Sequence, residues 1–289
     1  MGTDLTAVPI LGENMTDILE FLDSNGLFDS HAHYFDVRFE DRADDILQNN
    51  VFGKGFSGVI NVGTNNKNTL VCIDQAKKYE GMYVAAGIHP EEMLYCKDTY
   101  EEELSTLYEL INTKEKRQKN KIVALGEIGL DYHYEGYNKD LQLYCFEKQL
   151  KMAEELDLPV IIHDRDAHGD CFETVIKYKN VRGVFHSFSG SPEMARELVK
   201  RGWYISFSGV LTFKNARKTV ETADVVPLDR ILIETDCPYL APHPYRGQLN
   251  HSGLMALTAQ RLAEIKNLSY EAIVEITKNN AKTLFGIQK

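Results

Sequence analysis

Two histidines separated by one residue lie near the start of the chain, in the segment Asp29-Ser-His-Ala-His33. The apolar residues Leu27 and Phe28 precede this segment, which indicates the C-terminal end of a strand. Because residues i and i+2 of an extended chain point to the same side, His31 and His33 can present two imidazoles together. Paired imidazoles bind divalent metals, although a merely polar strand end would have the same sequence. Further ligands on other strands would favour the metal site.

Later strand ends carry such residues, namely Glu127 and Asp131 after the fourth predicted strand, His163 after the fifth, His186 after the sixth, and Glu234 and Asp236 after the eighth. In a parallel barrel the strand ends meet at one mouth. Four histidines and two carboxylates there suit two divalent ions. The predicted metal ligands are His31, His33, Glu127, His163, His186 and Asp236.

Two of these carboxylates are also the predicted catalytic residues. Glu127 can reach both ions and is the predicted bridge between them. Asp236 is the predicted partner of the water between the ions, as a ligand that also accepts the proton of this water. A bound divalent ion lowers the pKa of water towards neutrality, which provides a hydroxide at cellular pH.

The fold that would bring these residues together is predicted from the alternation of short apolar, β-branched runs with longer amphipathic segments. The predicted strands are Leu27–His31, Gly58–Val62, Tyr83–Gly87, Ile122–Gly126, Val160–His163, Gly183–His186, Tyr204–Ser206 and Ile231–Glu234. Helical spacing of apolar residues is clear near 140–156 and 254–265. Such alternation predicts a parallel sheet covered on both faces. Eight units without a Gly/Pro/Ser-rich linker favour a single α/β (β/α)₈ TIM barrel over an open doubly wound sheet.

We expect this barrel to occupy residues 27–289, after a short N-terminal extension over residues 1–26 with a helical turn or two around Met15–Leu22. The formal net charge of -11 and the pI of about 5.3 argue against a broad basic surface that holds nucleic acid. They do allow an enzyme that meets phosphate through bound metal and a few arginines. The one basic cluster, residues 114–121, precedes the fourth strand, so we expect a solvated helix end and loop at the bottom of the barrel.

Five cysteines, an odd number without C-x-x-C spacing, indicate reduced thiols. No signal peptide and no apolar run of transmembrane length is apparent. The expected location is therefore the cytoplasm, with the nucleus as a second location, and no membrane partner. Met1-Gly2 with Thr6 formally matches an N-myristoylation pattern, but chance matches to so short a pattern are common.

The remaining histidines are assigned one by one. His89, in Gly87-Ile-His-Pro90, ends the third strand and points to the same mouth, either as a contact of the substrate or metal ligands or as a structural polar group. Four others are expected in loops as solvated side chains, namely His133, His168, His243 and His251. Cys237 and Trp203 are assigned to packing.

With these residues in place, the chain resembles the TatD family of metal-dependent deoxyribonucleases, within the amidohydrolase-like barrels. The resemblance runs from about Leu27 to Gly286. The matching segments, in the order of the family, are Asp29-Ser-His-Ala-His33, Gly87-Ile-His-Pro90, Gly126-Glu-Ile-Gly-Leu-Asp131, His163-Asp-Arg-Asp-Ala167, His186-Ser-Phe-Ser-Gly190, Glu234-Thr-Asp-Cys-Pro-Tyr239 and Asn280-Ala-Lys-Thr-Leu-Phe-Gly286.

The resemblance implies a (β/α)₈ barrel that hydrolyses phosphodiester bonds of DNA with two divalent ions, magnesium or manganese, with zinc as a further option. It assigns one ion to His31, His33, Glu127 and Asp236, and the other to Glu127, His163 and His186. It also places Arg165 and His89 at the scissile phosphate. Family members are often 3′-to-5′ exonucleases linked to DNA repair or to DNA fragmentation in dying cells. DNA is the expected partner, with no obligatory protein partner, for a monomer or weak oligomer.

One segment departs from the family. After the eighth strand, Arg246-Gly-Gln-Leu-Asn-His-Ser252 stands where the family has an Arg-Asn-Glu-Pro-like stretch near the substrate groove. Arg246 and Asn250 are kept and are expected to bind substrate, whereas His251 and Ser252 replace an acidic residue and a proline. This departure concerns the placement of DNA and not the metals.

Two other functions compete with the nuclease. The first is an amidohydrolase-type enzyme that acts on a small amide, lactone or phosphoester with the same metals. Many such enzymes bridge their metals with a carboxylated lysine on strand four, where this chain has Glu127, and this difference favours the nuclease. The second is a binding protein with a relic metal site, and the complete ligand set argues against it.

Overall fold

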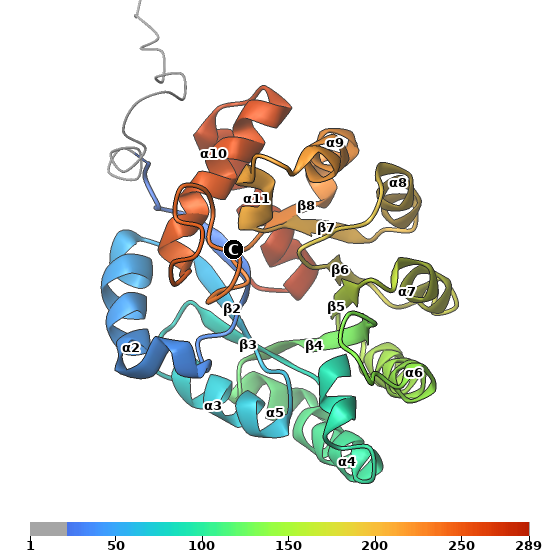
Figure 1. Cartoon of the computed structure of the whole chain (residues 1–289). Coiled ribbons are helices and arrows are strands. Elements are labelled where there is room, and N and C mark those ends of the chain that lie inside the picture. Colours follow the sequence, from blue (N-terminus) through green and yellow to red (C-terminus); the bar gives the residue numbers. More distant parts are fainter. Residues whose placement is uncertain (1–21, 289) are drawn as a thin grey trace, which may run out of the picture.

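The computed structural model describes residues 22–288, which form a barrel of eight parallel strands surrounded by helices (Figure 1). The strands pair in chain order and are β1 Phe28–Ala32, β2 Gly58–Val62, β3 Met82–Ala86, β4 Ile122–Asp131, β5 Val160–Arg165, β6 Gly183–Phe185, β7 Tyr204–Phe207 and β8 Ile231–Ile233. The chain beyond β8 closes the barrel against β1, because the Asp236 N–H donates to His31 O at 2.9 Å and the His33 N–H donates to Cys237 O at 2.8 Å. The predicted TIM barrel is confirmed.

The α-helices are α2 Ala43–Ile46, α3 Asn66–Ala76, α4 Tyr100–Ile111, α5 Lys114–Lys119, α6 Lys139–Leu156, α7 His168–Val175, α8 Pro192–Lys200, α9 Arg217–Val225, α10 Met255–Lys266 and α11 Tyr270–Phe285. A π-helical turn spans Leu47–Val51, and short 3₁₀ helices span Val37–Arg42, Phe52–Lys54, Pro90–Leu94, Gly209–Thr212, Leu228–Arg230 and Ser252–Leu254. The helices expected near 140–156 and 254–265 are confirmed as α6 and α10. The helical turn expected around Met15–Leu22 and the lipidation pattern at Gly2 lie, apart from Leu22, outside the described residues.

The barrel interior is apolar below its mouth. Inward residues of the strands pack in one cluster with the end of α11, and the cluster includes Phe28, Ile60, Ile161, Leu284 and Phe285. A second and larger cluster fills the space between the strands and the surrounding helices. Between residues 22 and 288, no helix has the length and apolar character that crossing a membrane requires.

The fourth strand is much longer than the sequence pattern predicts. We expected the fourth strand to end at Gly126, but β4 continues to Asp131 because Gly129 pairs with His163 and Asp131 pairs with Arg165 on β5. The Gly-Glu-Ile-Gly-Leu-Asp segment is therefore the upper half of a strand and not a loop beyond it. The apolar run that predicts the strand stops at Gly126 because Glu127 and Asp131 are polar, yet the whole extension is buried.

The basic cluster lies before β4, as expected, but forms a short helix of its own. Helix α5 begins after Thr113, whose hydroxyl accepts a hydrogen bond from the Lys116 N–H at 3.2 Å. This N-cap explains why the segment is helical, since the hydroxyl satisfies one of the free N–H groups at the helix start. The prediction of a helix end and loop was wrong in this detail.

Two bulges position metal-ligand candidates at the mouth. Between Asp29 and Ala32, β1 advances three residues while β2 advances two, from Val59 to Asn61. Between Leu125 and Ile128, β4 again advances three residues while β5 advances two. The first bulge contains His31 and the second contains Glu127. Because a bulge bends a strand and redirects its side chains, both residues are turned towards the same point.

Gly129 supports this arrangement, and its substitution tests it. Its φ is +145°, and a Cβ would lie 2.0 Å from His163 O. We expect Gly129→Ala to lower the free energy of unfolding by at least about 2 kcal/mol, because the backbone conformation and the contact are both unfavourable to a side chain. Urea-induced unfolding measures the change.

Gly202→Ala is the matched control, because Gly202 also has positive φ, +88°, but nothing within 4 Å of a Cβ. It should cost only about 1 kcal/mol. Equal losses in the two variants would contradict the close approach at Gly129.

Candidate metal centre

The first group of ligand candidates comes from β1, β4 and the segment after β8. The Nε2 atoms of His31 and His33 lie 3.0 Å apart, and Glu127 Oε2 lies 3.4 Å from the former and 3.6 Å from the latter. Asp236 Oδ1 lies 3.8 Å from His31 Nε2 and 3.3 Å from His33 Nε2. Four ligand atoms at about 2.1 Å from one ion in tetrahedral arrangement are about 3.4 Å apart. The five distances given above lie near this value, so the four atoms are candidate ligands of one divalent ion, and we name them the first subsite.

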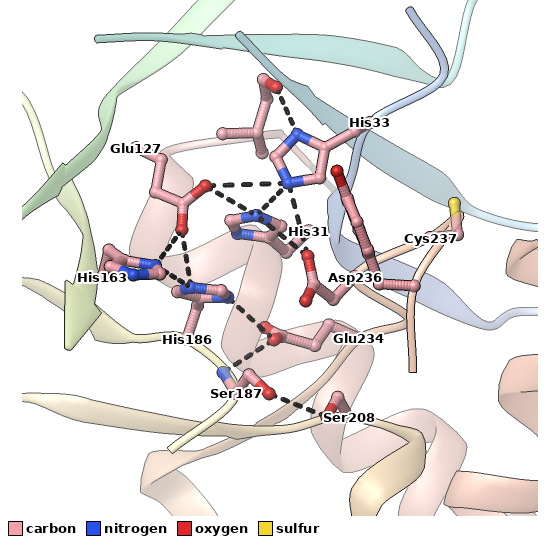
Figure 2. Close-up of polar contacts among 12 residues, drawn as sticks. His31, His33, Glu127, His163, His186, Ser187, Ser208, Glu234, Asp236 and Cys237 are labelled. Atoms are coloured by element: carbon pink, nitrogen blue, oxygen red, sulfur yellow. Dashed lines mark hydrogen bonds and ion pairs between the residues drawn. The ribbon is translucent and has the colours of Figure 1, made fainter. Parts of the chain in front are cut away.

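The second group shares Glu127 (Figure 2). The other carboxylate oxygen, Glu127 Oε1, lies 2.7 Å from His163 Nδ1 and 2.7 Å from His186 Nε2. The two imidazole nitrogens are 3.3 Å apart. We name these three atoms the second subsite. Each oxygen of Glu127 thus faces a different pair of histidines, which is the arrangement expected of a bridging ligand.

The structure brings together all six predicted metal ligands. Four of them are buried, namely His31, His33, Glu127 and His186, with exposures of 0%, 5%, 3% and 8%. All of the six except His31 line the cavity at the mouth. His89 Nε2 lies 3.7 Å from Glu127 Oε1, and its Nδ1 accepts a hydrogen bond from the Glu91 N–H. His89 therefore lies beside the second subsite, where it lines the cavity.

Charge at this site is concentrated on Glu127. Burial by itself would raise the pKa of this carboxyl, but the neighbouring His186, His31 and His89 hold it well below its ordinary value. Burial likewise opposes protonation of His186, yet the charge of Glu127 raises the pKa of this imidazole well above its ordinary value. The carboxylate thus attracts positive charge strongly, and divalent ions can supply that charge in place of protons.

Hydrogen bonds at the second ring nitrogen fix the orientation of three histidines. His33 Nδ1 lies 2.7 Å from Val62 O, His163 Nε2 lies 2.9 Å from Asp131 Oδ2, and His186 Nδ1 lies 3.2 Å from Glu234 Oε1. Such contacts set the tautomer, so that the opposite nitrogen presents its lone pair to an ion. Asp131 and Glu234 were noted as potential ligands in the sequence, but the structure places them behind the ligands.

A further buried carboxylate, Asp29, joins the first strand of the barrel to the segment that follows the last strand. It accepts hydrogen bonds from the backbone N–H groups of His31 and Thr235 and from the hydroxyls of Thr235 and Ser252. Burial raises the pKa of Asp29 to about 6. Sequence reasoning missed this role, because the hydroxyl partners are distant in the chain.

Above the histidines lies a cavity of ≈ 780 Å³. On one wall, the Arg165 guanidinium donates to the Tyr134 hydroxyl at 3.1 Å and lies 5.1 Å from the centre of its ring. Asp36 and Tyr239 form another wall, and Arg38, which does not line the cavity itself, stacks on Tyr239 at 3.7 Å and pairs with Asp36 through two hydrogen bonds. The cavity walls thus combine exposed tyrosines with the guanidinium group of Arg165.

Arg165 is placed in the cavity as predicted for a substrate contact, but Arg246 and Asn250 are not. Asn250 is fully buried, and its amide donates to Thr235 O and Tyr239 O while its oxygen accepts from the His251 N–H. Arg246 is exposed and lies 4.1 Å from the ring centre of Phe213. The segment that departs from the family therefore contributes structural contacts at Asn250 and Ser252.

Of the four histidines expected in solvated loops, two differ from that expectation. His168 is the first residue of α7 and pairs with Asp164 at 2.8 Å. His251 is mostly buried, and its Nδ1 has no partner. His133 is exposed and pairs with Asp166 in the cavity wall, and His243 is partly buried. Cys237 and Trp203 are buried, as predicted for packing residues.

A ligand set of histidines and carboxylates at the mouth of a (β/α)₈ barrel is characteristic of a metal-dependent hydrolase. The model of the family described as TatD related DNase matches residues 28–286. The chain belongs to the TatD family.

Several known proteins match the chain over nearly their whole length. The uncharacterized metal-dependent hydrolase YabD of Bacillus subtilis is 39% identical over 264 residues, which cover 90% of this chain and 99% of YabD. The uncharacterized metal-dependent hydrolase YcfH of Escherichia coli is 34% identical over 266 residues, covering 90% and 96% of the two chains. The crystal structure of YjjV, a TatD homologue from Escherichia coli, aligns with a TM-score of 0.83 at 29% identity, covering 91% and 99%.

The buried His251 predicts a dependence of stability on pH. Burial lowers its pKa to about 4, below the value of about 6.5 expected in the unfolded chain. Between these values the unfolded state binds more protons, so stability falls as the pH falls from 6.5 to 4. Wild-type protein should lose more stability over this range than His251→Gln, by at most about 3 kcal/mol. Urea unfolding of both proteins at pH 7, 5.5 and 4 measures the difference, and parallel curves would refute the prediction.

Proposed function

We propose that the protein is a metal-dependent deoxyribonuclease that hydrolyses DNA phosphodiester bonds with two divalent ions, removing nucleotides from the 3′ end. The main support is the position of Glu127, which directs one oxygen to each histidine pair at the base of an open cavity. The family model, described as TatD related DNase, supports the same reaction.

Each residue has a defined task in this proposal. When bound, the ions would neutralise the phosphate charge and lower the pKa of a water beside it. Asp236 would accept the proton that this water loses as its oxygen attacks phosphorus. The bond between phosphorus and the leaving sugar oxygen breaks in the same reaction, and this oxygen takes up a proton. Arg165, on the cavity wall, offers a planar pair of donors to the phosphate oxygens. His89, next to Glu127, would contact the same phosphate.

The cavity walls suit a nucleotide with one phosphate at the metals. The exposed rings of Tyr134 and Tyr239 can stack on bases, and stacking tolerates any base sequence. Carboxylates also line the cavity, among them Glu91, Glu92 and Asp166. Attraction of a polyanion to this site therefore depends on the ions, and we propose that metal-free protein binds DNA weakly.

The donor types bear on the choice of metal. The two subsites combine four imidazoles with two carboxylates, and imidazole suits zinc better than magnesium, which prefers oxygen ligands. We propose manganese or zinc as the ions bound most tightly, with magnesium active at higher concentration. We further propose that the protein acts as a monomer or weak oligomer, without an obligatory protein partner, in the cytoplasm and the nucleus.

The second candidate function is an amidohydrolase-type reaction on a small amide, lactone or phosphoester. The depth of the site favours this second reaction, because His31 and Glu127 are buried and the cavity volume suits a small ligand. The presence of Glu127 in place of a carboxylated lysine favours the nuclease.

Cleavage of end-labelled DNA separates the two functions. With manganese or magnesium, a 5′-labelled single-stranded oligonucleotide should shorten stepwise, whereas a 3′-labelled one should lose its label in the first step. The chelator EDTA and the variant Glu127→Gln should both abolish cleavage. If folded, metal-loaded protein leaves both oligonucleotides intact, DNA is not the substrate, and small esters and amides become the next test.

Removal of either catalytic carboxylate should abolish turnover without unfolding the barrel. For Glu127→Ala and Asp236→Ala we expect a fall in kcat of roughly a thousandfold or more, because each variant loses a metal ligand. Asp236→Ala also loses the proposed acceptor of the proton from the attacking water. Circular dichroism of each variant checks the fold. Wild-type rates in both variants would refute the site.

A further inference from the structure

Two polar atoms behind the metal centre have no hydrogen-bond partner. They are His31 Nδ1 and Glu234 Oε2, both on residues with 0% exposure. The other oxygen of this carboxylate, Glu234 Oε1, accepts a hydrogen bond from the Ser187 N–H at 2.7 Å and lies 3.2 Å from His186 Nδ1 (Figure 2). A buried polar atom without a partner is costly, so the two atoms call for an explanation.

The orphaned atoms belong to one compact group. Ligand-type atoms of His31, His186 and Glu234 lie within 4.8 Å of one another, and the two imidazole rings stack with centroids 4.0 Å apart and planes 14° apart. Both rings direct their Nε2 atoms towards Glu127, at 3.4 Å and 2.7 Å. Their Nδ1 sides therefore face away from the shared carboxylate of the metal centre.

A third ion is one explanation of this group, but the chemistry favours another. An imidazole that binds an ion through Nε2 carries its proton on Nδ1, and this N–H requires an acceptor. An ion on the Nδ1 side would require both rings to give up that proton as well. A carboxylate, by contrast, accepts hydrogen bonds with both oxygens.

We propose that Glu234 is a positioning residue shared by the two metal subsites once the ions are bound. Its Oε1 accepts the Nδ1–H of His186, and its Oε2 turns to accept the Nδ1–H of His31, a hydrogen bond that the structure itself does not contain. This inference rests on the two-ion function proposed above. One carboxylate then orients one ligand of each subsite, and the two ions are coupled through it as well as through Glu127. Binding at one subsite fixes the side chain on which the other subsite depends.

Asp131 provides a comparison within the same centre. It contacts His163 Nε2 at 2.9 Å, and His163 belongs to the second subsite only. Loss of the Asp131 charge should therefore weaken one ion, whereas loss of the Glu234 charge should weaken both. A residue that merely filled space would change neither affinity selectively.

The test is titration of metal-free wild type, Asp131→Asn and Glu234→Gln with manganese by calorimetry, with binding followed in parallel by electron paramagnetic resonance. We expect two ions in the wild type and, in Asp131→Asn, one affinity reduced by roughly ten- to a hundredfold. In Glu234→Gln we expect both affinities reduced by this factor, because the glutamine amide cannot accept the second N–H. If Glu234→Gln does not fold, Glu234→Asp, which keeps the charge at a shorter reach, takes its place with the same expectation.

A second measurement does not depend on variants. In zinc-loaded wild type with ¹⁵N-labelled histidine, both His31 and His186 should show a downfield, slowly exchanging Nδ1–H proton. The shared role would be overturned if the Glu234 variant lost affinity for only one of the two ions in the titration, or if wild-type His31 showed no such proton. Either result would leave the nuclease proposal in place. A wild type that binds one ion only would overturn the two-ion function and the coupling together.

Discussion

A negative charge buried among imidazoles is the constraint on which this site depends. Glu127 is 3% exposed, and five histidine nitrogens lie within 3.7 Å of its two oxygens. An ionised carboxylate that loses its water must be compensated by positive charge or hydrogen bonds. Within residues 22–288, no lysine or arginine pairs with Glu127, so the compensation comes from groups that can exchange a proton for an ion. The buried charge of Glu127 therefore attracts cations to the mouth of the barrel, and the histidines and Asp236 determine where those cations would bind.

Much of this arrangement could be predicted from the sequence, because barrel strands and metal ligands leave local patterns. The His-x-His pair after an apolar run and the polar residues after later strands identified all six ligand candidates. The (β/α)₈ rule then placed them at one mouth. The bulges at His31 and Glu127 could not be predicted from the pattern, because they arise from the pairing register between strands and not from residue type.

The errors also have physical causes. Asn250 and Ser252 lie in a segment that looks like a polar loop. Yet the Asn250 amide donates to two carbonyl groups of the segment after β8, and the Ser252 hydroxyl donates to the Asp29 carboxylate across the barrel seam. Asp131 and Glu234 resemble ligands in the sequence because each lies at a strand end close to a predicted ligand, Glu127 or Asp236. Their actual distance from Glu127 depends on side-chain direction, and in each case the second nitrogen of a histidine lies in between. Local sequence does not contain the partner of a buried polar group.

The closure of the barrel has a consequence for the order in which the protein is made. The first subsite lies across the seam, where Thr235 bonds to Asp29 over 206 residues of chain, whereas the second subsite draws its ligands from the adjacent strands β4, β5 and β6. Contacts that close so long a loop form late. During synthesis the second subsite can therefore be complete while the first still awaits the C-terminal quarter of the chain. If the reaction needs both ions, as proposed, the nascent chain would remain inactive until the segment after its last strand has docked against its first strand.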